Sequence, residues 1–282
     1  MFNKNRIHEL LSSYPRKRPP LTAMHEKLYI QEYKRNREGD VKINNLAQKL
    51  EIWMHHQITK HQSENLLELG AGTLNHLEYE NPDTVYDIVE PFTELFQNSS
   101  QLDHVDGAYS SLEEIPKDKK YSRIISIAAL EHMTNLPLEV AMSATHMDNS
   151  SLFQAGIPSE GGFLWWLGWR CTTGVSYWLR NGLDYGILMR HEHVNKAWEI
   201  ITIINYFFEN VKIKRFPTPI HNLSFYTYIE ATRPNVDRIE RVIEFAKKGV
   251  TSIYDLVAFS NSAPPAISPL VSLISRSYSY SD

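Results

Sequence analysis

The sequence predicts an α/β fold built on a seven-stranded, mostly parallel, doubly wound sheet. An apolar run at 65–69 ends in Gly70-Ala71-Gly72, as a buried parallel strand does when it leaves its sheet by a tight turn. Further short apolar runs then alternate with segments of helical periodicity. This alternation is typical of parallel strands joined by right-handed crossovers.

The composition is that of an ordinary folded domain. The 282 residues are 42% hydrophobic and 22% charged, and the formal net charge is −4. This charge argues against a general nucleic-acid or anionic-membrane binder. The single cysteine, Cys171, excludes an internal disulfide framework and favours a cytoplasmic location. No secretory signal is expected in the polar residues 1–18, and no apolar stretch is long enough for a transmembrane helix.

Residues 1–62 are predicted to form an N-terminal arm and a helical lid. A short helix near 6–12 precedes a basic arm, which we expect to be loosely held at the surface. Helices are predicted over 21–37 and 43–61, and the second has apolar residues at a 3.6-residue period. These helices are expected to lie over the sheet or over a ligand.

Residues 63–232 form the predicted core, and 233–282 a charged helix, 236–248, with a weakly ordered tail. Strands are expected at 65–69, 85–89, 103–108, 123–127, 151–155, 211–216 and 223–229. The last two are close in sequence, which favours an antiparallel pair at that edge. Helices are expected at 73–79, 92–98, 137–147 and 195–208.

Residues 157–193 interrupt the alternation and are predicted to be an irregular cap over the site. Long insertions in compact domains are usually functional, and this one contains four tryptophans. Aromatic faces stack on sugar rings and cations bind acidic groups, so Trp165 and Arg190 are candidate acceptor-binding residues. Glu160 is a third candidate, because its carboxylate could bind acceptor hydroxyls. Alternatively, Glu160 caps a turn. The tryptophans could also pack inward, or form an oligomer contact or a peripheral membrane contact.

The glycine turn leaves two kinds of ligand open. A dinucleotide site needs a third glycine where this chain has Asn75. Glu68 suits a ligand with a cationic group, and Glu90, at the end of the second strand, could accept hydrogen bonds from two ribose hydroxyls. Together they favour a phosphate-free nucleoside with an ammonium and a sulfonium. The plainer alternatives are an exposed strand-end carboxylate for Glu68 and a helix cap for Glu90.

At this point the sequence resembles the class I S-adenosylmethionine-dependent methyltransferases. The matching segments are 67–72, 87–91 and 125–133, in the same order and strand context. The resemblance implies a Rossmann-like methyltransferase fold and S-adenosyl-L-methionine as the cofactor. It assigns cofactor binding to the loop residues Glu68, Gly70 and Gly72, to Glu90 at the ribose, and to Ala128 after the fourth strand.

More narrowly, the chain looks like uncharacterised bacterial methyltransferases of polysaccharide and lipopolysaccharide gene clusters. This resemblance rests on segments 33–39, 46–55, 156–162 and 190–195. It implies a transferase of polysaccharide biosynthesis that O-methylates a saccharide or cell-surface polymer precursor, with a small-molecule or glycan acceptor.

The chain departs from the family's pattern at two positions. Leu74 stands where the family has a third glycine, which puts the shape of the loop in question. Ala108 replaces an acid that commonly contacts adenine, so Tyr109 or Ser110 must serve the adenine, unless the backbone alone does. The alternative function is a catalytically weak or inactive cofactor-binding subunit that acts as an interaction module.

Two histidines are catalytic candidates. A sugar hydroxyl has a high pKa and benefits from a general base. His132 follows the fourth strand at the ligand-binding edge, and His193 precedes the long helix; each could instead be structural. We expect His191 to be structural. No metal is expected, because His191 and His193 lack a third ligand nearby.

Two lid residues complete the candidate site. Tyr33 and Arg37 could reach the methionine carboxylate of the cofactor from the helix predicted at 21–37. Alternatively, the two residues lie on a solvent-exposed face of that helix and have no role in binding.

Overall fold

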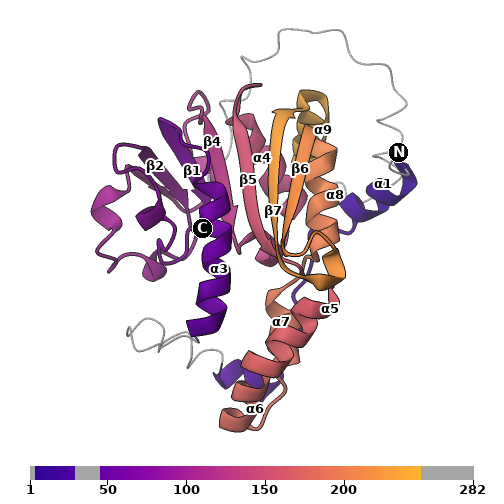
Figure 1. The fold of residues 1–282 in the computed structure, drawn as a ribbon. Helices are drawn as coiled ribbons and strands as arrows, with labels where there is room; N and C mark the ends of the chain where they lie inside the picture. Colours follow the sequence, from indigo (N-terminus) through magenta and orange to yellow (C-terminus); the bar gives the residue numbers. More distant parts are fainter. Residues whose placement is uncertain (1–3, 29–44, 249–282) are drawn as a thin grey trace, which may run out of the picture.

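The structure, a computed structural model, describes residues 4–28 and 45–248. Its strands are β1 (Asn65–Leu69), β2 (Val85–Val89), β3 (Gly107–Tyr109), β4 (Arg123–Ile127), β5 (Leu152–Pro158), β6 (Phe208–Pro217) and β7 (Ser224–Pro234). They form one sheet in the order β3-β2-β1-β4-β5-β7-β6, in which β7 alone runs against the others (Figure 1). The predicted seven-stranded, mostly parallel sheet is confirmed, including the antiparallel pair at its edge.

Helices cover both faces of the sheet (Figure 1). One face packs under α3 (Asn45–Ile58), with Leu66 and Ile88 in that core. The other face packs under a group of four helices, with Leu67 and Leu69 in that core. The four are α1 (Lys4–Ser12), α4 (Leu136–Thr145), α8 (Ala197–Phe207) and α9 (Val236–Lys247). Successive strand residues therefore supply opposite cores, as the pleat requires.

Two predicted helices are single turns, and one strand is shorter than expected. The segments 73–79 and 92–98 contain only the 3-10 turns η1 (Leu77–Tyr79) and η2 (Thr93–Leu95). The 3-10 turn η3 (Leu102–His104) replaces the start of the strand expected at 103–108. These crossovers are rich in Asn, Ser and Asp, whose side chains compete for backbone hydrogen bonds and favour turns.

The cap is helical rather than irregular. It contains α5 (Phe163–Trp169), the π-helical turn η6 (Arg170–Gly174), α6 (Val175–Asn181) and α7 (Tyr185–Glu192). Figure 1 shows these elements below the sheet, beyond the carboxyl end of β5. Two glycines mark helix ends in the cap: Gly162 precedes α5, and Gly182, with a φ of +69°, ends α6. No described helix is long and apolar enough to cross a bilayer.

The N-terminal arm is bound tightly to the body, contrary to our expectation. Three apolar residues of α1 are buried: Ile7, Leu10 and Leu11. Arg16 forms a bidentate pair with Glu199 of α8, at 2.9 and 2.7 Å. Arg18 donates to the carbonyl of His132 at 3.0 Å. The basic residues that suggested a solvated arm therefore have partners far along the chain.

The turn after β4 is tied to the start of α8 by a buried carboxamide. The side chain of Asn195 donates to the carbonyls of Leu130, at 2.8 Å, and Met133, at 2.7 Å. The carbonyl of Glu131 accepts from the amides of Val194 and Asn195, at 2.9 and 3.1 Å. These bonds hold residues 130–133 against 193–195.

A buried polar cluster lies between α3 and the sheet. His76 has a partner on each ring nitrogen. Its Nδ1 is 2.9 Å from Nδ1 of His55, and its Nε2 is 2.8 Å from Oε1 of Glu80. Arg123 also contacts the Glu80 carboxylate. Burial alone would raise the pKa of Glu80, but the hydrogen bond to His76 and the charge of Arg123 outweigh burial and lower it. The cluster fixes α3 and the segment after the glycine loop to the sheet.

We predict that Asn195→Ala lowers the free energy of unfolding by about 2–4 kcal/mol, because it leaves buried carbonyls and the hydroxyl of Tyr14, which donates to Asn195, without partners. Urea unfolding followed by circular dichroism measures the change. The control is Asn205→Ala, which removes one bond to a carbonyl of its own helix. An equal loss in the two variants would contradict the role of Asn195.

We also predict acid destabilisation through His55. Burial, and then the charges of His76 and His56, lower the pKa of His55 to about 4, against about 6.5 in the unfolded chain. The unfolded state therefore binds more protons between these values. The free energy of unfolding should fall by up to about 3 kcal/mol as the pH falls through this window, with no further loss from His55 below it.

The check is to repeat the unfolding measurements across this pH window with His55→Asn. This variant should show a flatter dependence, because the titrating group is gone. His104→Asn, at an exposed position, controls for the substitution. An unchanged slope in His55→Asn would refute the assignment.

Candidate active site

A cavity of about 640 Å³ lies at the carboxyl ends of β1, β2 and β4. The strand order reverses between β1 and β4, and ligands of open α/β sheets bind at such a point. The structure brings five of the predicted site residues together along this cavity: Gly70, Gly72, Glu90, Ala128 and His132.

The glycine loop keeps a tight left-handed conformation despite its departure from the family's pattern. Gly70 has a φ of +71°, and a Cβ there would lie 2.5 Å from that of Ala129. Leu74 has a φ of +66° and is fully buried, so it adopts the conformation that a glycine would at the third position. An L-residue in this region costs about 1–2 kcal/mol, which burial of the leucine side chain offsets.

Glu90 is oriented by the loop it faces. Its Oε2 accepts from the amide of Gly72 at 2.9 Å, and its Oε1 accepts from the amide of Phe92 at 3.0 Å. The side chain thus caps the turn that follows β2, as in the plainer interpretation. Each carboxylate oxygen has a second lone pair, so Glu90 can also accept from a ligand in the cavity that it lines.

Glu68 does not line this cavity. It lies under α3 because its neighbours Leu67 and Leu69 face the opposite core, and it accepts from the hydroxyl of Tyr86 at 2.6 Å. Burial raises the pKa of Glu68. The side chain is only 2% exposed, so the alternative of an exposed strand-end carboxylate does not hold either.

Of the two candidates for the adenine end, Ser110 lines the cavity and Tyr109 does not. The Tyr109 ring packs against the core and has the ammonium of Lys119 5.8 Å from its centroid. Tyr33 and Arg37 lie outside the described residues.

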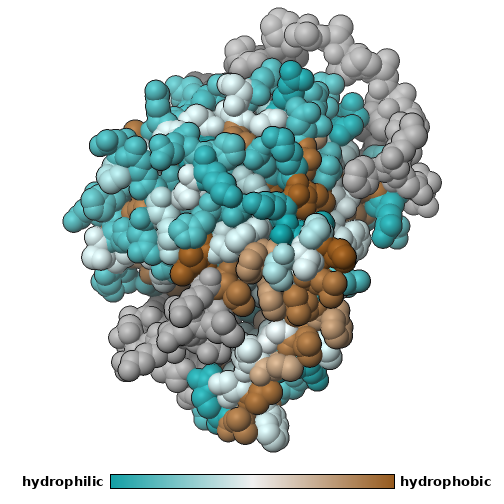
Figure 2. Space-filling model, viewed as in Figure 1, coloured by the Kyte–Doolittle hydropathy of each residue, from teal (hydrophilic) through white to brown (hydrophobic). Residues whose placement is uncertain are grey.

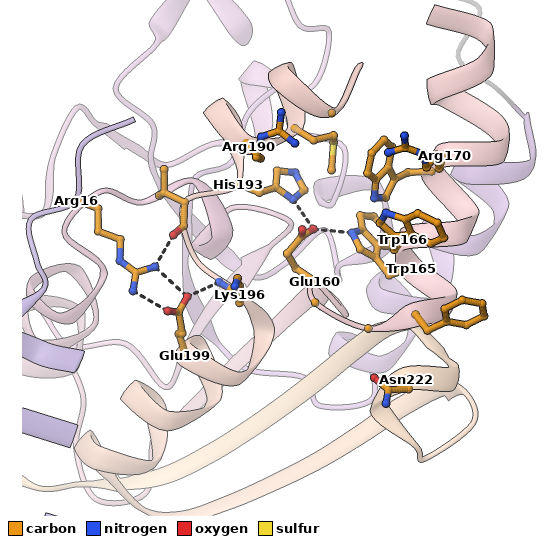
Figure 3. Close-up of a pocket in the computed structure, with 17 residues that line it drawn as sticks. Arg16, Glu160, Trp165, Trp166, Arg170, Arg190, His193, Lys196, Glu199 and Asn222 are labelled. Atoms are coloured by element: carbon orange, nitrogen blue, oxygen red, sulfur yellow. Dashed lines mark hydrogen bonds and ion pairs between the residues drawn. The ribbon is translucent and has the colours of Figure 1, made fainter. Parts of the chain in front are cut away.

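A second cavity, of about 750 Å³, lies in the cap (Figure 3). The predicted acceptor-binding residues Glu160, Trp165 and Arg190 line it, and so does His193. Sequence reasoning missed two of its cations. Arg16 comes from the N-terminal arm and Lys196 from the start of α8, and neither belongs to a motif.

Glu160 connects the cap to His193 (Figure 3). Its Oε2 accepts from the indole Nε1 of Trp165 at 2.6 Å and lies 3.1 Å from Nδ1 of His193. A carboxylate oxygen can only accept, so Nδ1 of His193 carries the hydrogen. In the neutral ring, Nε2 then keeps its lone pair.

His132 meets His193 edge to face, with ring centroids 4.9 Å apart. His132 lines the cavity at the strand ends and His193 lines the cap cavity, so the pair lies where the two cavities approach each other. Nδ1 of His132 is 3.0 Å from the carbonyl of Glu192, and its Nε2 is 3.9 Å from the Glu131 carboxylate. Burial lowers the pKa of His132, but hydrogen bonding to Glu192 and the charge of Glu131 outweigh it and raise the pKa.

His191 and His193 turn to different partners. Nδ1 of His191 donates to the carbonyl of Pro19 at 2.7 Å, which fits a structural role. We expected no metal because we considered only His191 and His193 as a pair of ligands. The structure instead groups His193 with His132 and Glu131, with one potential ligand atom of each within 4.8 Å of the others.

No protein-family profile matches the sequence, and no curated protein sequence matches it significantly. Solved structures do match. The plantazolicin methyltransferase BpumL, in complex with a pentazolic desmethylPZN analogue and S-adenosyl-L-homocysteine, is 12% identical over 83% of this chain and 100% of its own, with a TM-score of 0.51. A SAM-dependent methyltransferase from Thermotoga maritima is 14% identical over 74% of this chain and 98% of its own, with a TM-score of 0.50. At these identities the likeness concerns the fold, and this chain has the Rossmann-like fold of S-adenosylmethionine-dependent methyltransferases.

Proposed function

We propose that this protein transfers a methyl group from S-adenosyl-L-methionine to an oxygen atom of an acceptor held in the cap cavity. One observation carries the proposal. His132 lines the cavity at the strand ends and His193 lines the cap cavity, and the two rings are in contact, with centroids 4.9 Å apart. A sulfonium bound in the first cavity and a hydroxyl bound in the second would face each other there.

The residues of the first cavity suit the parts of this cofactor. Glu90 offers carboxylate lone pairs to the two ribose hydroxyls, and Gly70 and Gly72 let the nucleoside approach the backbone. Ser110 lines the same cavity and is our candidate for a hydrogen bond to the adenine. Arg18 also lines the cavity, near His132, and offers a cation to the carboxylate of the methionine part.

The residues of the cap cavity suit a saccharide or surface-polymer precursor with an acidic group. Trp165, Trp166 and Trp169 offer faces for sugar rings. Arg190 and Arg170 line the same cavity, and such cations bind phosphate or carboxylate groups. A glycan acceptor fits this combination better than an uncharged apolar one.

The reaction is an in-line displacement. An oxygen lone pair of the acceptor forms the new O–CH₃ bond while the C–S bond breaks, and its electron pair stays on sulfur as a neutral thioether. The hydroxyl proton must leave. A histidine can help by accepting this proton, or by holding a cation that polarises the hydroxyl.

An interaction module that only binds the cofactor is the second candidate, and the surface of the cap favours it. Exposed apolar side chains are concentrated there: Phe163, Trp166, Leu167, Trp178 and Leu179. Figure 2 shows apolar residues gathered over this part of the molecule. Such patches mark interaction sites.

We predict that S-adenosylmethionine binds the wild-type protein and that Glu90→Ala weakens binding about 10- to 100-fold, because hydrogen bonds to a carboxylate are lost. Isothermal titration measures both affinities. The control Glu113→Ala changes an exposed glutamate and should bind like the wild type. Absence of wild-type binding at millimolar cofactor would refute the proposal.

We further predict that His193→Gln lowers kcat about 10²- to 10⁴-fold, as loss of hydroxyl activation does, while cofactor affinity stays within about twofold. The assay follows a labelled methyl group into sugar nucleotides, lipid-linked sugars and cell-envelope extracts. His191→Gln is the matched control and should retain kcat. Cofactor binding without transfer to any of these acceptors would favour the interaction module instead.

A further inference from the structure

We propose that Glu131, His132 and His193 bind a divalent metal ion that holds and activates the acceptor oxygen. This inference rests on the proposed function and specifies how the hydroxyl is activated. Potential ligand atoms of the three side chains lie within 4.8 Å of one another. Two imidazoles and one carboxylate are a ligand set that zinc and other first-row divalent ions use while positions stay open for water or substrate.

Glu131 supplies an observation that points to a cation. Its side chain is 2% exposed, and its Oε2 has no hydrogen-bond partner among the described residues. A buried carboxylate oxygen without a donor is costly, and a bound cation removes that cost.

The two histidines are already arranged as metal ligands usually are. Nδ1 of His193 donates to the carboxylate of Glu160, and Nδ1 of His132 donates to the carbonyl of Glu192. A metal-bound histidine almost always donates its other ring N–H to such a group, which fixes the tautomer. Nε2 is therefore the nitrogen that each ring keeps for an ion. The indole of Trp165 in turn orients Glu160.

The backbone holds the ligands close before any ion binds. Residues 130–133 and 193–195 are joined by Asn195 and by the two amides that donate to the Glu131 carbonyl. Metal–ligand bonds of about 2.0–2.2 Å place the ligand atoms about 3–3.5 Å apart. The three ligand atoms now lie within 4.8 Å of one another, so small side-chain rotations would bring them to that spacing.

The position of this group between the two cavities gives the ion a chemical task. An acceptor hydroxyl bound to the metal would become more acidic and would release its proton to solvent. Its oxygen would then form the bond to the methyl carbon as the C–S bond breaks, with the electron pair left on sulfur. An acceptor with two adjacent oxygens, such as the vicinal diol of a sugar, could chelate the ion through its open positions.

The test is metal binding by the full-length protein after removal of adventitious ions with a chelator. Co²⁺ is the probe, because its visible spectrum reports coordination directly. We expect one equivalent of Co²⁺ in the wild type. Glu131→Gln and His193→Gln should each weaken binding by more than about 100-fold, since loss of a ligand costs more than the 10–100-fold loss of an outer partner.

Two further variants make the result specific. Glu160→Gln removes the carboxylate partner of His193 and should weaken Co²⁺ binding about 10- to 100-fold. His191→Gln, two residues from His193, should bind Co²⁺ like the wild type. Circular dichroism and S-adenosylmethionine titration verify that each variant is folded.

The outcomes separate this inference from the proposed function. A wild type that binds the cofactor but no stoichiometric Co²⁺ overturns the metal site alone. The same holds if folded Glu131→Gln and His193→Gln bind Co²⁺ as the wild type does. Failure to bind S-adenosylmethionine, with Co²⁺ binding intact, overturns the proposed function and leaves the ion site standing.

Discussion

The candidate active site depends on the buried carboxamide of Asn195. It spans the turn that follows β4 and the segment that opens α8, and it bonds the carbonyls of Leu130 and Met133. The amides of Val194 and Asn195, which donate to the Glu131 carbonyl, join the same two segments. These bonds hold His132 beside His193, and the two histidines line different cavities. The side chain of Asn195 therefore helps to couple the parallel core to the segment that follows the cap.

The carboxylates that line or adjoin the two cavities differ in their hydrogen-bond donors. Glu90 accepts from two backbone amides, Glu160 accepts from an indole and an imidazole, and Glu199 is paired with a guanidinium. Each has a fixed orientation because its donors are fixed. Glu131 is as buried as any of them, yet its Oε2 has no hydrogen-bond donor among the residues that the structure describes. This oxygen is the observation on which the proposed cation site depends.

The sheet and the glycine loop could be predicted because their signals are local: short apolar runs, glycines and the acid after β2. The sequence could not predict which face of the sheet the side chain of Glu68 occupies. That depends on which residues of β1 face each of the two cores, and only the tertiary fold decides this. Glu131 was missed because its neighbour His193 is distant in sequence, and only the tertiary fold joins them. The N-terminal arm was misjudged for the same reason: the partner of Arg16 is Glu199, which lies 183 positions further along the chain.

The first twenty residues have a consequence for protein engineering. Arg18 lines the cavity at the strand ends and Arg16 lines the cap cavity, so one short stretch forms part of the wall of both. A minimised variant that starts at β1 would keep every strand of the sheet, yet it would lose surface from each cavity. Chimeras that exchange only residues 15–20 between related chains would instead change the walls of both cavities and leave the buried face of α1 in place.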